Sequence, residues 1–139
     1  MDTHLMFWPA VAMAALTFVV WLCMFFRRIG QMKRERVHPQ AVATSGAAAA
    51  RLTDSAAADN FRNLFELPVL FYVLVVLLHQ RASVAIGFVA GAWLYVALRA
   101  THSFIQCTYN KVMHRFTVYF ASAWVLWILW GAFAVSLVR

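Results

Sequence analysis

The sequence predicts an all-α integral membrane protein, an antiparallel four-helix bundle that forms a single domain over residues 1–139. Hydrophobic residues make up 64% of the chain and charged residues only 12%, whereas a soluble domain is nearer half apolar, with about twice that charge. The apolar residues gather in four long runs. Two of the connections between these runs are short, and short connections make neighbouring helices antiparallel.

The first predicted span covers about residues 5–26, which include no charged residue. As a helix this run is about 30 Å long, enough to cross the hydrocarbon layer. Arg27 and Arg28 follow it, whereas no Lys or Arg precedes it. A secretory signal has the opposite layout, so we expect this segment to remain as a span.

Residues 27–60 are polar or small, and we expect a mobile loop with helical pieces. A basic run opens the loop and an alanine-rich stretch follows over residues 41–58. The commoner role of such a run is to stop translocation and set orientation. An alternative is that it holds anionic lipid headgroups.

The remaining spans are predicted at about residues 61–79, 83–109 and 116–138. Lys and Arg concentrate in the region 27–62 and in the turn 110–115, so the positive-inside rule places both on the cytoplasmic side and both termini on the other. We therefore expect a multi-pass protein of a bacterial inner membrane.

The stretch from Asp59 to Pro68 carries polar residues into the start of the second span. On a continuous helix Asp59, Arg62, Asn63 and Glu66 share one face. Pro68 cannot donate to the carbonyl four residues earlier, so we expect a bend beside them. Ionisable groups at membrane depth indicate a site. The alternative is an Arg62–Glu66 pair that simply begins the helix.

Two further polar faces reach the same end of the bundle. In the third span, polar residues recur at helical spacing: Tyr95, Arg99, His102, Gln106 and Tyr109. At the start of the fourth span the polar residues Arg115, Tyr119 and Ser122 also recur at helical spacing. More cations than carboxylates at a buried edge favour an anionic ligand. The alternative is that these polar residues only hold the helices together by hydrogen bonds between them, each worth about 1 kcal/mol.

Several classes of protein are excluded. No basic stripe interleaved with aromatic residues lies on a soluble segment, so nucleic acid is not an expected partner. No Cys, His or carboxylate set has zinc spacing, and we expect no metal. Cys23 and Cys107 lie in different apolar runs and are expected to be packed thiols.

The sequence resembles the MAPEG family, the membrane-associated proteins of eicosanoid and glutathione metabolism, and in particular its microsomal-glutathione-transferase-like members. The resemblance covers essentially the whole chain. Three motifs carry it: Arg62-Asn63-x-x-Glu66 beside a proline, Arg99-x-x-His102, and Arg115-x-x-x-Tyr119.

The resemblance implies a homotrimer that binds glutathione as co-substrate at subunit interfaces near the cytoplasmic face. It implies a transferase or peroxidase acting on hydrophobic electrophiles, with membrane lipid around it and a lipophilic second substrate. Arg115 would stabilise the glutathione thiolate as the catalytic residue. The glutathione-binding residues would be Lys33, Arg62, Asn63, Glu66, His102 and Tyr119, with Arg99 and Gln106 in supporting positions.

Four positions depart from the family pattern. Lys33 stands where members place an arginine, Gln106 where a tyrosine often contacts glutathione, and Phe116 where a small residue can occur; Pro68 comes closer to Glu66 than in the mammalian enzymes. They leave open a second interpretation, a non-catalytic membrane lipid-binding or scaffold protein of the same fold.

Overall fold

The computed structural model describes residues 3–81 and 83–138, and its regular elements over these residues are all helical. Their bounds, in chain order, are η1 Thr3–Met6, α1 Phe7–Arg34, η2 Pro39–Val42, α2 Ser45–Arg51, α3 Ala56–Asn63, α4 Leu67–His79, α5 Ile86–Cys107 and α6 Val112–Val138. The all-helical prediction is confirmed.

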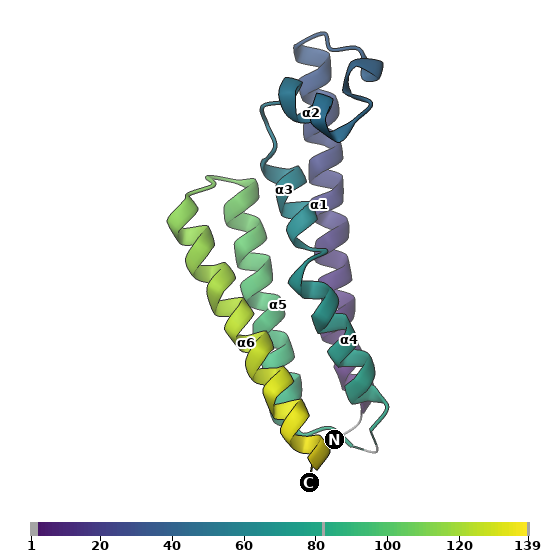
Figure 1. Cartoon of the computed structure of the whole chain (residues 1–139), viewed down its shortest axis with the longest axis vertical. Coiled ribbons are helices and arrows are strands. Elements are labelled where there is room, and N and C mark those ends of the chain that lie inside the picture. The colour runs from purple at the N-terminus through teal and green to yellow at the C-terminus, as the bar shows by residue number, and fades with distance from the viewer. Residues whose placement is uncertain (1–2, 82, 139) are drawn as a thin grey trace.

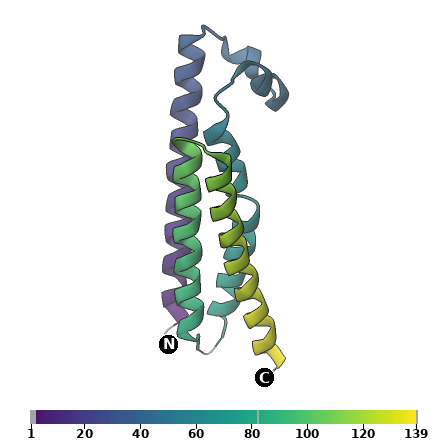
Figure 2. The ribbon, with the colours of Figure 1, turned by 90° about the vertical axis from the view of Figure 1, so that its left-hand side faces the viewer.

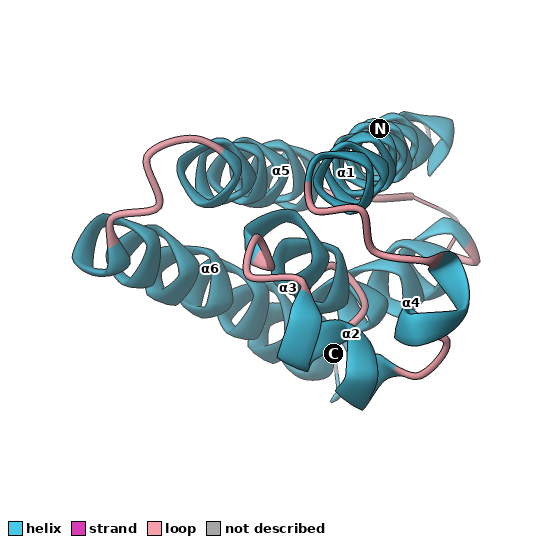
Figure 3. Cartoon of the chain, turned by 90° about the horizontal axis from the view of Figure 1, so that it is seen from above, coloured by secondary structure: helices cyan, strands magenta, loops and turns pink. Residues whose placement is uncertain are grey.

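The long helices run side by side along one axis (Figures 1 and 2). Seen from above, α1 and α5 are neighbours in one row, and α6 and the α3–α4 segment form a second row beside them (Figure 3). The start of α1 and the end of α6 lie at one end of the molecule, and α2 lies at the other, beside the last turns of α1 (Figure 1).

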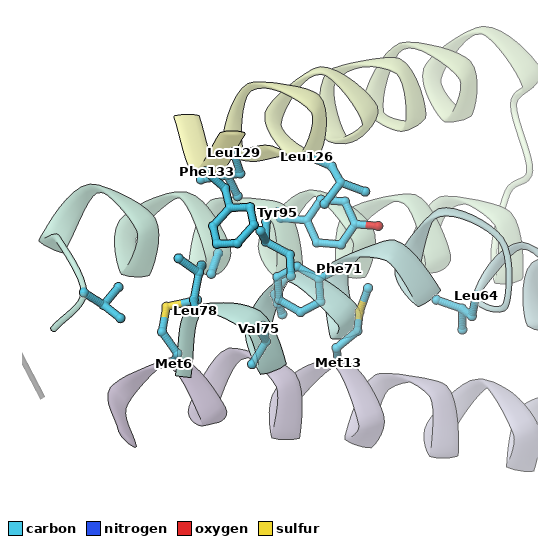
Figure 4. Packing of buried hydrophobic residues seen from close by; sticks show 14 of the residues in the cluster. Met6, Met13, Leu64, Phe71, Val75, Leu78, Tyr95, Leu126, Leu129 and Phe133 are labelled. Atoms are coloured by element: carbon cyan, nitrogen blue, oxygen red, sulfur yellow. The ribbon is translucent and has the colours of Figure 1, made fainter. Parts of the chain in front are cut away.

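An apolar core fills the half of the molecule that holds the start of α1 (Figure 4). The Tyr95 ring of α5 stacks on Phe71 of α4, with centroids 4.8 Å apart. Leu126 and Leu129 of α6 cover this pair, and Met13 of α1 approaches from the opposite side (Figure 4). Side chains from four helices therefore interlock at this level.

The outer surface is apolar as well, as is typical of a protein surrounded by lipid. Large hydrophobic side chains are exposed along α1 and α6, among them Phe18, Phe26, Phe116, Trp124 and Ile128. Within the described chain, three helical stretches are long and apolar enough to cross a membrane: Thr3–Arg34, Ala56–His79 and Val112–Val138. An integral membrane protein is therefore supported.

Helix α5 is not among those three stretches, although the sequence predicts a span at 83–109. Its second half carries the polar residues Arg99, His102, Ser103 and Gln106. These lower its mean hydropathy, yet all four are buried inside the protein.

The connection predicted at 27–60 is more ordered than expected. Helix α1 continues through the basic run to Arg34, eight residues past the predicted end of the first span. The buried side chain of Gln31 then fixes the connection to α1 through two hydrogen bonds. Its Oε1 accepts from the Asp54 N–H at 3.2 Å, and its Nε2 donates to Thr53 Oγ1 at 3.1 Å. Helices η2 and α2 complete the segment.

The second predicted span consists of two helices. α3 begins at Ala56 and ends at Asn63, and α4 begins at Leu67, so the helix is interrupted shortly before Pro68. The expected bend is thus a complete interruption over residues 64–66. Because of it, Glu66 does not continue the helix face of Asp59, Arg62 and Asn63, and the prediction of one shared face is wrong at Glu66.

Candidate functional site

A polar pocket of about 240 Å³ lies where the break between α3 and α4 faces α5 and the start of α6. Its walls carry seven residues, namely Asn63, Glu66, His102, Val112, Arg115, Phe116 and Tyr119. Five of these are residues that the sequence analysis singled out: Asn63, Glu66, His102, Arg115 and Tyr119. Three separate segments contribute them, so the pocket exists only in the folded chain.

The break between α3 and α4 shapes one wall of this pocket. Asn63 is the last residue of α3, and Glu66 immediately precedes the first residue of α4. Pro68 lies in the first turn of α4, where its missing N–H costs no helical hydrogen bond. The interruption therefore releases Glu66 from the helix and leaves it exposed at the pocket wall.

His102 connects the α5 and α6 walls. Its Nδ1 lies 3.1 Å from the carbonyl oxygen of Arg115, and its Nε2 lies 2.9 Å from Gln106 Oε1. Gln106 Oε1 also accepts from Asn63 Nδ2 at 3.4 Å. Each ring nitrogen thus lies beside an oxygen acceptor, to which it donates when it carries a proton, and Gln106 links the pocket residues of α3 and α5.

Arg99 lies behind the pocket and is fully buried, with 0% of its surface exposed. Its NH2 donates to the carbonyl oxygen of Asn63 at 3.0 Å, and its guanidinium carbon lies 5.3 Å from the centroid of the Tyr119 ring. Its Nε and NH1 have no hydrogen-bond partner among the described residues. An arginine stays charged in proteins, so these buried donors favour an acceptor supplied by a ligand.

Arg115 begins the α6 wall, and the turn before it sets its position. Asn110 adopts the left-handed conformation with φ 46°, which asparagine tolerates better than most residues. Its Oδ1 accepts from Arg115 NH1 at 2.8 Å. Among the lining residues Arg115 faces one carboxylate, that of Glu66, and Arg99 lies buried behind them. Two arginines near one carboxylate suit a ligand with anionic groups.

A second set of polar contacts fastens α3 to α5 beside the pocket. Ser103 Oγ donates to Asn60 Oδ1 at 3.2 Å, and Asn60 Nδ2 donates to Cys107 Sγ at 3.4 Å. Asn60 and Ser103 are buried, and the sequence analysis did not single out either. The available signal was position: Asn60 lies three residues before Asn63, on the same face of α3.

Several predicted residues lie away from this pocket. The side chain of Arg62 is 73% exposed and pairs with Asp59 at 3.7 Å, so the alternative interpretation, an Arg62–Glu66 pair, is not found. Lys33 is exposed in the last turn of α1. Tyr109 lies past the end of α5 and is exposed, unlike the rest of its predicted stripe.

A helical membrane protein with a polar pocket lined by an arginine and a glutamate is the class that the fold and the pocket define. Within that class, the chain belongs to the MAPEG family, whose sequence model matches residues 6–135. Comparisons with curated proteins and with solved structures found no match. Membership supports a membrane function related to glutathione or eicosanoids at the level of the family.

Proposed function

We propose that this protein is a membrane glutathione transferase or peroxidase that acts on hydrophobic electrophiles. The observation that carries the proposal is the gathering of Asn63, Glu66, His102, Arg115 and Tyr119 around one pocket in a chain of the MAPEG family. Glutathione has two carboxylates, an ammonium group and a thiol. Arg99 and Arg115 suit its anionic groups, and Glu66 suits its ammonium group.

The chemical step requires a thiolate. A free cysteine thiol has a pKa of about 8.5 and is mostly protonated at neutral pH. Arg115 would lower the pKa of the bound thiol, because a cation close to it in a partly desolvated pocket favours the charged form. The thiolate sulfur would then attack the electrophilic atom of a lipophilic substrate that reaches the pocket from the bilayer. In a substitution the leaving group, such as the distal oxygen of a peroxide, would depart with the bonding electron pair, and in an addition the adduct would take up a proton.

The proposal includes four membrane spans and three subunits. α4 ends at the end of the molecule where α1 begins, and α6 starts towards the other end (Figure 1), so α5 has to return across the bilayer between them. Most polar residues of α5 face inward, namely Arg99, His102, Ser103 and Gln106, while Trp93, Leu94 and Phe104 face outward. In a homotrimer, Lys33 would reach glutathione from a neighbouring subunit, since within its own chain it does not line the pocket.

Calorimetry of glutathione binding to the purified protein in detergent tests this proposal. Glu66→Ala should weaken binding by about 2–3 kcal/mol, the effect of losing a charged hydrogen-bond partner. Because Glu66 is exposed, the variant should assemble and melt like the wild type. Glu35→Ala, which removes a carboxylate that does not line the pocket, should leave the affinity unchanged. Equal affinities for wild type and Glu66→Ala would refute the assignment of Glu66.

A further inference from the structure

A second hollow, of about 100 Å³, lies beside the last turns of α1, where α2 and α3 cover it. Three arginines reach its wall, Arg27 and Arg28 from α1 and Arg62 from α3. It shares no lining residue with the pocket of Glu66 and Arg115.

The charges of this hollow do not balance. Arg27 Nε pairs with Asp54 Oδ2 at 3.5 Å, and Arg62 pairs with Asp59, whose other oxygen accepts from Ser55 Oγ at 2.8 Å. Each carboxylate therefore already has a cation.

Two donors are left over among the described residues. Arg28 makes no ion pair, and the NH1 of Arg27 is buried without a hydrogen-bond partner. A buried donor of a charged group is costly when unsatisfied, so the NH1 of Arg27 favours an added anion over a further cation. Arg28 is exposed and adds a positive charge that no described carboxylate pairs with.

The shape of the hollow limits the size of that anion. Much of its wall consists of the alanines of α2 and α3, Ala48, Ala49, Ala57 and Ala58. These short side chains leave the space open. About 10–15 Å³ of such space is enough for one water molecule, so the hollow admits a group the size of a phosphate.

The position of the arginines along α1 indicates where the anion comes from. The apolar part of α1 from Phe7 to Phe26 is about 30 Å long, the thickness of the hydrocarbon layer. Arg27 and Arg28 follow it directly and so stand at the level of the lipid headgroups. Phe25 and Phe26 are exposed just below them, as expected for residues in contact with acyl chains.

We propose that the hollow between α1, α2 and α3 binds a phosphate group, with Arg28 and the NH1 of Arg27 as its donors, and that a phospholipid of the surrounding bilayer supplies this group. The alanine-rich segment thereby acquires a role: α2 closes the hollow over the headgroup. The hollow shares no lining residue with the pocket of Glu66 and Arg115, so we expect it to bind lipid independently of glutathione.

Calorimetric titration of the full-length protein in detergent with short-chain phosphatidylglycerol, below its critical micelle concentration, tests the site. We expect saturable binding of one lipid per chain. Arg28→Gln should weaken it at least tenfold. Arg34→Gln removes the same charge from α1 outside the hollow and should change it less than twofold. If the two variants lost the same amount of lipid affinity, the effect would come from the surface charge of α1 alone, and the proposal would be overturned.

A volume test keeps the charges constant. Ala49→Leu fills the hollow from α2, whereas Ala50→Leu adds the same atoms on the same helix outside its wall. Only Ala49→Leu should abolish lipid binding. If both variants bind like the wild type, the hollow is not the binding site.

Two competitors identify the source of the phosphate. Inorganic phosphate should displace the lipid only weakly, because it lacks the acyl chains that Phe25 and Phe26 contact; displacement at equal concentration would overturn the assignment to a lipid. Saturating glutathione should leave lipid binding unchanged. Competition between them would show that the hollow belongs to the glutathione site instead.

Discussion

Arg99 is the residue at which burial and charge conflict most sharply. It is completely buried, yet two of its three nitrogens have no partner within the described chain. Such an arrangement lowers stability unless a ligand completes it. In the proposed enzyme a carboxylate of glutathione would accept hydrogen bonds from these nitrogens, and the protein without glutathione would be less stable because it lacks them.

We therefore expect Arg99→Met to abolish the effect of glutathione without lowering the stability of the unliganded protein. Removal of a poorly compensated buried charge should not lower the unfolding temperature of the unliganded protein, and replacing buried charges by apolar groups has been stabilising by about 1–4 kcal/mol elsewhere. The rise in unfolding temperature that glutathione produces should disappear. Thermal unfolding in detergent with and without glutathione measures both effects.

Arg81→Met provides the matched control. Arg81 donates to Ser136 Oγ at 3.1 Å and to the Ser136 carbonyl oxygen at 3.2 Å, so its donors are satisfied and lie away from the pocket. This variant should melt at a lower temperature and still respond to glutathione. A lower unfolding temperature for Arg99→Met as well would assign Arg99 a structural role.

Arg115 is expected to control the chemistry more than the affinity. In the wild type, bound glutathione should show the ultraviolet thiolate band at pH 7 and lose it as the pH falls through the lowered pKa of its thiol. Without the cation this pKa should return toward about 8.5, each unit corresponding to about 1.4 kcal/mol. Arg115→Ala should thus lack the band at pH 7, and conjugation should fall in parallel.

Stopped-flow absorbance at the thiolate band, combined with calorimetry, checks this expectation. Lys111→Ala removes a cation from the same turn outside the pocket and should behave like the wild type. An unchanged band in Arg115→Ala would remove this residue from the mechanism. A wild type that binds glutathione without any thiolate band would favour the non-catalytic scaffold.

At the scale of the elements, the contact between α5 and α6 depends on Gly91. A Cβ built at this position would lie 2.6 Å from Leu129 Cδ2, whereas a Cβ at Gly87, one turn earlier on α5, meets nothing within 4 Å. Leu129 is packed in the core, so it cannot move aside freely.

We expect Gly91→Ala to leave the protein about 1–3 kcal/mol less stable than Gly87→Ala, because overpacking forces core side chains out of their rotamers. Gly87→Ala should itself be neutral or stabilising, since alanine favours the helix. Unfolding of both variants in detergent gives the difference. In a Leu129→Ala background the two substitutions should become equivalent; a difference that persists there would exclude this contact as the cause.

At the scale of the whole molecule, orientation and the number of crossings can be tested together. Reporter fusions after Gly46 and after Asn110 should report the cytoplasm, and a fusion after Arg81 the opposite side, because Lys and Arg are concentrated around the first two positions. Opposite signals at Arg81 and Asn110 would establish α5 as a span. The same signal at these two positions would contradict both the four-span arrangement and the proposed path of α5.

The sequence alone was sufficient for the helical membrane class, the family, a bend near Pro68 and the residue types of the pocket. Each depends on local information: length and apolarity of a run, a missing backbone N–H, or a motif of fixed spacing. The limits of local information appear at Glu66, which the break between α3 and α4 removes from the predicted helix face, and at α1, which continues as a helix through its basic run.

Only the tertiary structure decided which of the predicted residues meet. Arg62 and Asn63 are adjacent in sequence, yet Asn63 lines the pocket shared with α5 and α6, while Arg62 turns to the hollow beside α1. Neighbours on a helix point about 100° apart, so which of them reaches a given pocket depends on how that helix packs. The same packing buries Asn60 and Ser103 against each other, a contact across 43 residues that no local pattern encodes.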